Sequence, residues 1–171
     1  INNITMSASM FLIKTIFSAL IAISTIFFGQ AYPFEPIQLS LISACGVGIP
    51  TFFLTYEANF ARVEENFLET VLEKSFPSAF TIAIGATLIT NIGLALNYDP
   101  NMLSTVCVLF TGWNYTVALL RIYRPLTKYR KFIIYSTQFC YYISMMIGQS
   151  ILELTGVSFN WLMILLGLIA F

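Results

Sequence analysis

The chain is 171 residues long, with 58% hydrophobic and 9% charged residues, whereas soluble domains carry about 25% charged residues. Eight Lys and Arg balance eight Asp and Glu, so the sequence offers no basic surface for nucleic acid. It contains no histidine, which excludes His-ligated haem, the usual zinc sites and a Ser-His-Asp triad within this chain. The composition therefore indicates a membrane protein that holds no cofactor and carries out no catalysis by itself.

Six apolar segments approach the roughly 20 residues that a helix needs to cross a bilayer core. They are Met6–Phe28, Ile37–Tyr56, Phe76–Leu96, Met102–Leu120, Phe132–Ile151 and Leu154–Phe171. Long unbroken apolar runs lack the alternation of lipid-facing barrel strands. The predicted fold is therefore all-α, a polytopic membrane protein with six transmembrane helices.

Basic residues gather in two of the five connections between these segments. They are Arg62 and Lys74 after the second segment, and Arg121, Arg124, Lys128, Arg130 and Lys131 after the fourth. The other connections contain no Lys or Arg. By the positive-inside rule, the two basic loops and both termini are predicted to be cytoplasmic. The sequence begins at Ile1 and ends within an apolar run at Phe171, so we expect it to be part of a longer chain.

Lys14 is the one basic residue inside a predicted span. It lies about eight residues into the first segment, roughly 12 Å along the helix axis. A charge at that depth costs several kcal/mol unless it is paired, hydrated or extended to the interface. Ser7, Ser18 and Thr25 share its helix face, so we expect this face to point into the bundle. The alternative is a lysine that extends back to the cytoplasmic interface.

The second span contains the run Cys45-Gly46-Val47-Gly48-Ile49-Pro50. Pro50 has no N–H to give to a carbonyl in the preceding turn, so the helix is expected to open there. Open backbone within a membrane is tolerated where it lines protein or water, and its carbonyls can bind cations. Ser43 and Gln38 could add side-chain oxygens. The alternative is a purely structural kink.

Residues 57–75 form the only long connection and have the pattern of a short amphipathic helix. Its apolar positions include Phe60, Val63, Phe67 and Val71, and its other faces carry Arg62 and several glutamates. An anionic leaflet repels glutamates. We therefore expect this segment to dock onto a cytoplasmic protein surface rather than onto lipid headgroups.

The second span also carries a family resemblance. Pro36-Ile-Gln-Leu, Gly48-Ile-Pro50 and the run from Thr51 to Asn59 together resemble the sixth transmembrane helix of cation-transporting P-type ATPases. Ile1-Asn2-Asn3-Ile4 resembles the stalk that enters the fifth helix of these pumps. The resemblance is strongest to a bacterial subfamily similar to the mycobacterial calcium-uptake ATPases. It implies that the six spans are helices five to ten of a ten-helix membrane domain.

The same resemblance implies candidate residues of an ion path. Thr15 and Ser18 fall where calcium pumps of animal reticulum have an asparagine and a glutamate. Ser43, Gly46 and Val47 fall where those pumps have an asparagine, a threonine and an aspartate. The side-chain ligands are therefore weaker here. Lys14 adjoins the first ligand position and could act as a tethered ammonium that occupies a cation site.

The resemblance further implies alternating access driven by an aspartyl phosphate, with ATP and Mg²⁺ bound outside these 171 residues. Residues 1–56 would supply the ion path and the stalk entry, and residues 76–171 a four-helix scaffold. Residues 57–75 would couple the path to the missing phosphorylation domain. The coupling candidates are Asn2, Asn3, Glu57, Arg62 and Phe67. The implied partners are the lipid bilayer of the plasma membrane, the catalytic part of the same protein, and a cation such as calcium.

Two other functions fit the same composition. One is a free-standing six-helix channel or secondary transporter, which would act without ATP. The other is a subunit that only packs within a larger membrane complex, in which Lys14 and Pro50 would be packing details. A channel or transporter of this kind usually has a repeat or a carboxylate relay in the membrane, and the sequence has neither.

Overall fold

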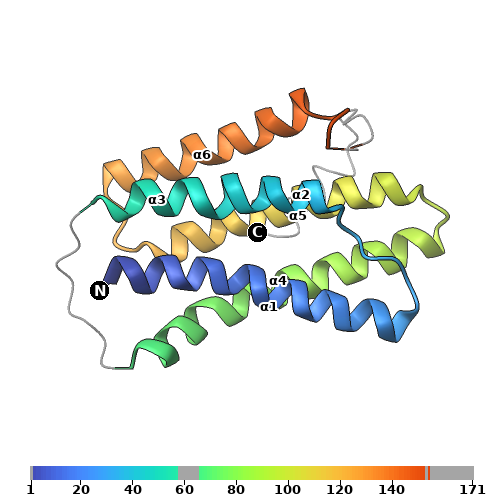
Figure 1. Cartoon of the computed structure of the whole chain (residues 1–171), viewed down its shortest axis with the longest axis horizontal. Coiled ribbons are helices and arrows are strands. Elements are labelled where there is room, and N and C mark those ends of the chain that lie inside the picture. The colour runs from blue at the N-terminus through green and yellow to red at the C-terminus, as the bar shows by residue number, and fades with distance from the viewer. Residues whose placement is uncertain (1, 58–65, 153, 155–171) are drawn as a thin grey trace.

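The computed structural model describes residues 2–57, 66–152 and 154, and over these residues it contains helices and loops but no strand. The long helices run side by side in one bundle (Figure 1). The elements are α1 (Asn2–Phe28), α2 (Pro36–Leu41), η1 (Ile42–Gly48), α3 (Ile49–Thr55), α4 (Phe67–Ala95), α5 (Pro100–Ile122) and α6 (Lys128–Ile147). The prediction of an all-helical protein is confirmed over the described residues.

Four described helices are long and apolar enough to cross a membrane. They span Asn3–Phe28, Pro36–Thr55, Phe67–Ala95 and Pro100–Ile122, and they match the first four predicted segments. The fifth predicted segment falls largely on α6, whose first turn is basic and whose composition is less apolar. The sixth lies outside the described residues apart from Leu154. The count of six spans and the cytoplasmic placement of the termini therefore stay predictions.

The helices alternate in direction, which places their connections at two ends of the bundle (Figure 1). One end holds the start of α1, the end of α3, the start of α4 and the α5–α6 loop. We call this the N-terminal end. The α1–α2 loop, the α4–α5 loop and the end of α6 lie at the opposite end. This alternation places the described part of the first basic connection, at the start of α4, at the same end as the α5–α6 loop.

The core forms where α1 packs along α4 and α4 packs along α5. Met10, Ile13, Phe17 and Ile21 of α1 recur at a spacing of three or four residues and are almost completely buried. The rings of Phe17 and Tyr115 of α5 form a T-shaped pair with centroids 6.3 Å apart. Apolar burial between helices therefore sets which face of α1 points inward.

The predicted boundary at Ser75 is not a break in the structure, because α4 runs without interruption from Phe67 to Ala95. Pro77 lies inside this helix and has no N–H for the Glu73 carbonyl four residues earlier. The guanidinium of Arg121 on α5 donates to that carbonyl at 3.5 Å and to the Lys74 carbonyl at 3.3 Å. A donor from a neighbouring helix thus stands in for the missing one. Residues 58–65 of the predicted amphipathic segment, including Arg62, lie outside the described residues.

Candidate functional site

Lys14 lies near the middle of α1, and its ammonium donates a hydrogen bond to the hydroxyl of Ser43 in η1. The Ser43 hydroxyl in turn donates to the Leu39 carbonyl at 2.5 Å. The lysine side chain is half-buried and crosses between two helices instead of extending along α1 toward the interface. Because the hydroxyl is uncharged, this contact leaves the positive charge of the ammonium without neutralisation. The structure thus brings two of the predicted site residues together.

The helix that carries Ser43 is not broken at the proline, contrary to the sequence prediction. It continues from α2 through η1 into α3, and η1 is a seven-residue π-helix in which the Ile49 N–H donates to the Ala44 carbonyl five residues back. The wider turn moves Pro50 into the first turn of α3, a position that tolerates proline. The Thr51 hydroxyl also donates to the Val47 carbonyl at 2.7 Å. The proline is therefore accommodated by widening the helix rather than by unwinding it.

A π-helical segment is rare and is frequently found at functional sites. Pro50 supplies no N–H, so residue 50 gives no bond to the Cys45 carbonyl at π-helical spacing or to the Gly46 carbonyl at α-helical spacing. These carbonyls lie in the same turn of helix that follows Ser43. The arrangement places a cationic side chain, a hydroxyl and a turn with altered backbone pairing in one part of the bundle.

The side chains of the other predicted ion-path residues do not join the contact between Lys14 and Ser43. Thr15 is exposed, and its hydroxyl donates to the Phe11 carbonyl of its own helix at 3.3 Å. Gly46 is buried against Tyr115 of α5, and Val47 is fully buried. Among the described residues, no group of three or more His, Cys, Asp or Glu side chains could hold a metal ion. A cation here would therefore depend on hydroxyl, amide and backbone oxygens of this part of the chain.

Two further hydroxyls on the polar face of α1 contact other elements, whereas Thr25 donates to the Ala22 carbonyl of its own helix at 2.8 Å. Ser7 lies 3.4 Å from the Thr55 hydroxyl, and Ser18 hydrogen-bonds the hydroxyl of Tyr32. Burial raises the pKa of the Tyr32 hydroxyl, while the bond to Ser18 opposes this rise. The tyrosine is therefore protonated at neutral pH.

Gln38 does not supply a free ligand oxygen. Its side chain is 1% exposed, and its Oε1 accepts from the Ser104 hydroxyl at 2.7 Å and from the Glu35 N–H at 3.1 Å. Its Nε2 donates to the Leu152 carbonyl at 3.1 Å. Gln38 therefore joins the start of α2 to α5 and to the chain beyond α6. Its role is to hold these segments together rather than to bind a cation.

A second polar cluster, at the N-terminal end, surrounds Glu57. The guanidinium Nε of Arg130 donates to the Glu57 carboxylate at 2.6 Å, and the Asn3 amide donates to the Glu57 carbonyl at 2.8 Å. Asn3 and Glu57 are coupling candidates that the structure brings together. The side chain of Asn2 is not described, and Phe67 is exposed at the start of α4, outside this cluster. Sequence reasoning missed Arg130, whose charge it assigned only to membrane orientation.

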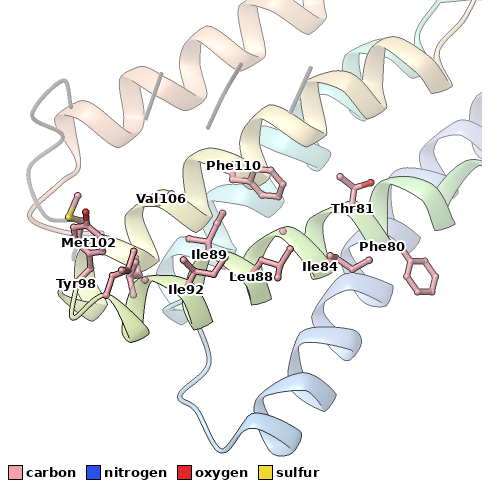
Figure 2. Close-up of a pocket in the computed structure, with 14 residues that line it drawn as sticks. Phe80, Thr81, Ile84, Leu88, Ile89, Ile92, Tyr98, Met102, Val106 and Phe110 are labelled. Carbon is pink, nitrogen blue, oxygen red and sulfur yellow. The ribbon is translucent and has the colours of Figure 1, made fainter. Parts of the chain in front are cut away.

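An apolar groove of about 660 Å³ lies between α4 and α5 (Figure 2). Figure 2 shows Ile84, Leu88 and Ile92 from α4 opposite Val106 and Phe110 from α5. The side chains that line it are almost all hydrocarbon. Such a surface suits lipid or another apolar group and offers little to a cation, so the groove is separate from the candidate ion path.

Taken together, these features define the class as a multi-pass membrane protein with a cationic side chain inside a helical bundle. Comparison with known proteins narrows that class. Over 142 residues the chain is 32% identical to the probable cation-transporting ATPase exp7 of Streptococcus pneumoniae, a match that covers 78% of this chain and 18% of that protein. Over 92 residues it is 32% identical to the calcium-transporting ATPase CtpE of Mycolicibacterium smegmatis, covering 48% of this chain and 12% of that protein.

No family model and no solved structure matches the chain. The chain spans less than a fifth of the length of the two curated relatives it matches. The similarity to cation-transporting ATPases and the apolar helices support a membrane part of a cation pump.

Proposed function

We propose that this chain is the membrane domain, helices five to ten, of an ATP-driven P-type cation pump in the plasma membrane. In this proposal the subfamily is the bacterial one that resembles the mycobacterial calcium-uptake ATPases, and calcium is the candidate cation. ATP and Mg²⁺ bind a catalytic part that lies outside these 171 residues. The chain alone does not hydrolyse ATP.

The contact between Lys14 and Ser43 beside the π-helical segment carries this proposal. A lysine that only terminated at the lipid interface would extend along α1, whereas this ammonium crosses to the helix that resembles an ion-path helix. The transported cation would approach the same turn, through carbonyl and hydroxyl oxygens on η1. The tethered ammonium would then compete with it and lower the number of ions moved in each cycle.

Cation transport and phosphorylation are expected to require the part of the protein that lies outside this chain. Vesicles that contain the full-length protein are expected to move a cation only when ATP and Mg²⁺ are supplied, and to form an acid-stable phosphoenzyme. Vesicles with the 171-residue chain alone, at equal membrane levels, are expected to do neither, because the groups that react with ATP are absent. Cation flux assays and acid-gel phosphorylation measure both properties.

Two other outcomes would contradict the proposal. Cation flux through the 171-residue chain without ATP would support a free-standing channel or secondary transporter. If the full-length protein inserted correctly but neither formed a phosphoenzyme nor moved any cation tested, a packing subunit would be supported instead.

A further inference from the structure

Arg130 is a buried guanidinium in the first turn of α6. The residue is 3% exposed, and its Nη1 donates to the carbonyls of Tyr123 and Pro125 at 3.1 Å each. Its own N–H donates to the hydroxyl of Thr127, which caps the helix at 3.1 Å. A basic residue that only set membrane orientation would be free in solvent. Arg130 is instead fixed by the backbone of the α5–α6 loop.

The Nε donor of this guanidinium bonds Glu57, two residues after the end of α3. Nε lies 2.6 Å from Glu57 Oε2, and the Thr127 hydroxyl donates to Glu57 Oε1 at 2.8 Å. The side chains of Arg130 and Glu57 are 4% and 22% exposed. Charged hydrogen bonds of this kind are short and strong, and a buried pair is costly to break from one side. The α5–α6 loop therefore holds the end of α3 through both carboxylate oxygens.

The same residue is tied to the first turn of α1. The Asn3 amide nitrogen donates to the Glu57 carbonyl at 2.8 Å and to the Thr55 carbonyl at 3.0 Å. A further contact joins α3 to α6, where the Tyr129 hydroxyl donates to the Phe53 carbonyl at 3.2 Å. Three segments distant in sequence thus meet at Glu57, namely the start of α1, the end of α3 and the start of α6.

This geometry has a mechanical consequence for the helix that contains η1. Its end is held against α6 and joined to α1, whereas its middle contains the widened turn beside Lys14. If the catalytic part displaces the start of α1, the Asn3 amide pulls on the end of α3, and Arg130 resists sliding of that end along α6. The displacement is then taken up at η1, where the hydrogen-bond pattern is already altered.

We infer that Arg130 is a positioning residue for transport, which holds the end of α3 through Glu57 so that movement of α1 acts on η1. This inference rests on the proposed function of the chain as the membrane domain of a cation pump. It gives the basic α5–α6 loop a part in coupling, in addition to its part in membrane orientation.

The test measures cations moved per ATP hydrolysed by the full-length protein, with insertion checked by phosphoenzyme level. For Arg130→Gln we expect this ratio to fall about five- to tenfold, in the usual range for coupling between sites. ATP hydrolysis and the cation concentration for half-maximal hydrolysis are expected to change less than about twofold, because Arg130 does not contact the cation site. Lys128→Gln is the matched control, since it removes the same charge from an exposed position of the same turn.

Two further variants separate a coupling role from a folding role. Glu57→Gln retains an oxygen that can accept from Arg130 but lacks the charge, so we expect a smaller fall in the ratio. The double variant E57Q/R130Q is expected to lose no more than R130Q alone, because neither charge then lacks a partner. If R130Q fails to insert, a lowered ratio in E57Q supports the inference.

A wild-type ratio in the inserted R130Q protein would overturn the inference, as would a wild-type ratio in E57Q if R130Q fails to insert. Additive losses in E57Q/R130Q would also overturn it, since the two side chains would then act independently. If the wild-type protein shows no ATP-dependent transport, the proposed function itself fails and the inference fails with it. If the wild-type protein transports cations with ATP and these variants keep its ratio of cations per ATP, the inference fails and the proposed function stands.

Discussion

Replacing Lys14 with methionine is expected to tighten cation binding by the full-length protein and to raise the charge moved per cycle. At an effective dielectric constant of about 20, two unit charges about 6 Å apart repel by about 3 kcal/mol, so a monovalent cation would gain about a hundredfold in affinity and a divalent cation such as calcium more. Methionine fills similar space without the charge. Cation-dependent phosphoenzyme formation measures the affinity, and transport current per ATP measures the charge moved.

Lys14→Gln separates the charge from the hydrogen bond, because a glutamine amide can still donate to the Ser43 hydroxyl. If the charge is what matters, Lys14→Gln tightens binding as Lys14→Met does. The control is Ser40→Ala, an exposed hydroxyl that donates to the Pro36 carbonyl of its own helix. Unchanged affinity and unchanged stoichiometry in both Lys14 variants would rule out the ammonium as an occupant of the cation site.

Gly112→Ala is expected to destabilise the bundle where α5 packs against α6. A Cβ atom at residue 112 would lie 2.2 Å from Cε1 and 2.8 Å from Cζ of Tyr141. The Tyr141 ring is fully buried, and its hydroxyl donates to the Val108 carbonyl at 2.8 Å, so the ring cannot move aside without losing that bond. Overpacking of this kind costs about 1–3 kcal/mol, which outweighs the gain of at most about 1 kcal/mol from helix propensity.

The measurement is the thermal unfolding midpoint of the full-length protein in detergent, which we expect to fall for Gly112→Ala. Gly46→Ala is the comparison, because its nearest neighbour, Tyr115 Cγ, would lie 3.4 Å from the new Cβ in ordinary contact. A midpoint for Gly112→Ala equal to that of Gly46→Ala would mean that the α5–α6 contact is looser than described.

Sequence reasoning located three of the four positions on the polar face of α1, because these positions depend on helical spacing, which is local; Thr25 bonds its own helix instead. Lys14, Ser7 and Ser18 share a face at the expected intervals, and all three contact residues outside α1. It could not predict how the helix passes Pro50. Opening and widening both avoid the missing hydrogen bond, and the proline by itself does not distinguish between them.

The ion pair between Glu57 and Arg130 could not be predicted from neighbouring residues in the sequence either. Arg130 follows it by 73 residues, and five basic side chains in the same loop have similar sequence signals. Nothing in the charge pattern distinguishes the one whose guanidinium is buried. The cap at Thr127 and the carbonyls of Tyr123 and Pro125 make that distinction, and they come together only when the loop folds.

By itself, the sequence determined that this is a bundle of apolar helices with a lysine inside the first of them. Hydropathy and helical periodicity follow from each residue and its near neighbours, so they need no knowledge of packing. Only the tertiary structure decided that the lysine contacts Ser43, that the helix widens at η1, and that Arg130 holds Glu57. Each of these depends on which distant side chains the packed helices place within hydrogen-bonding distance.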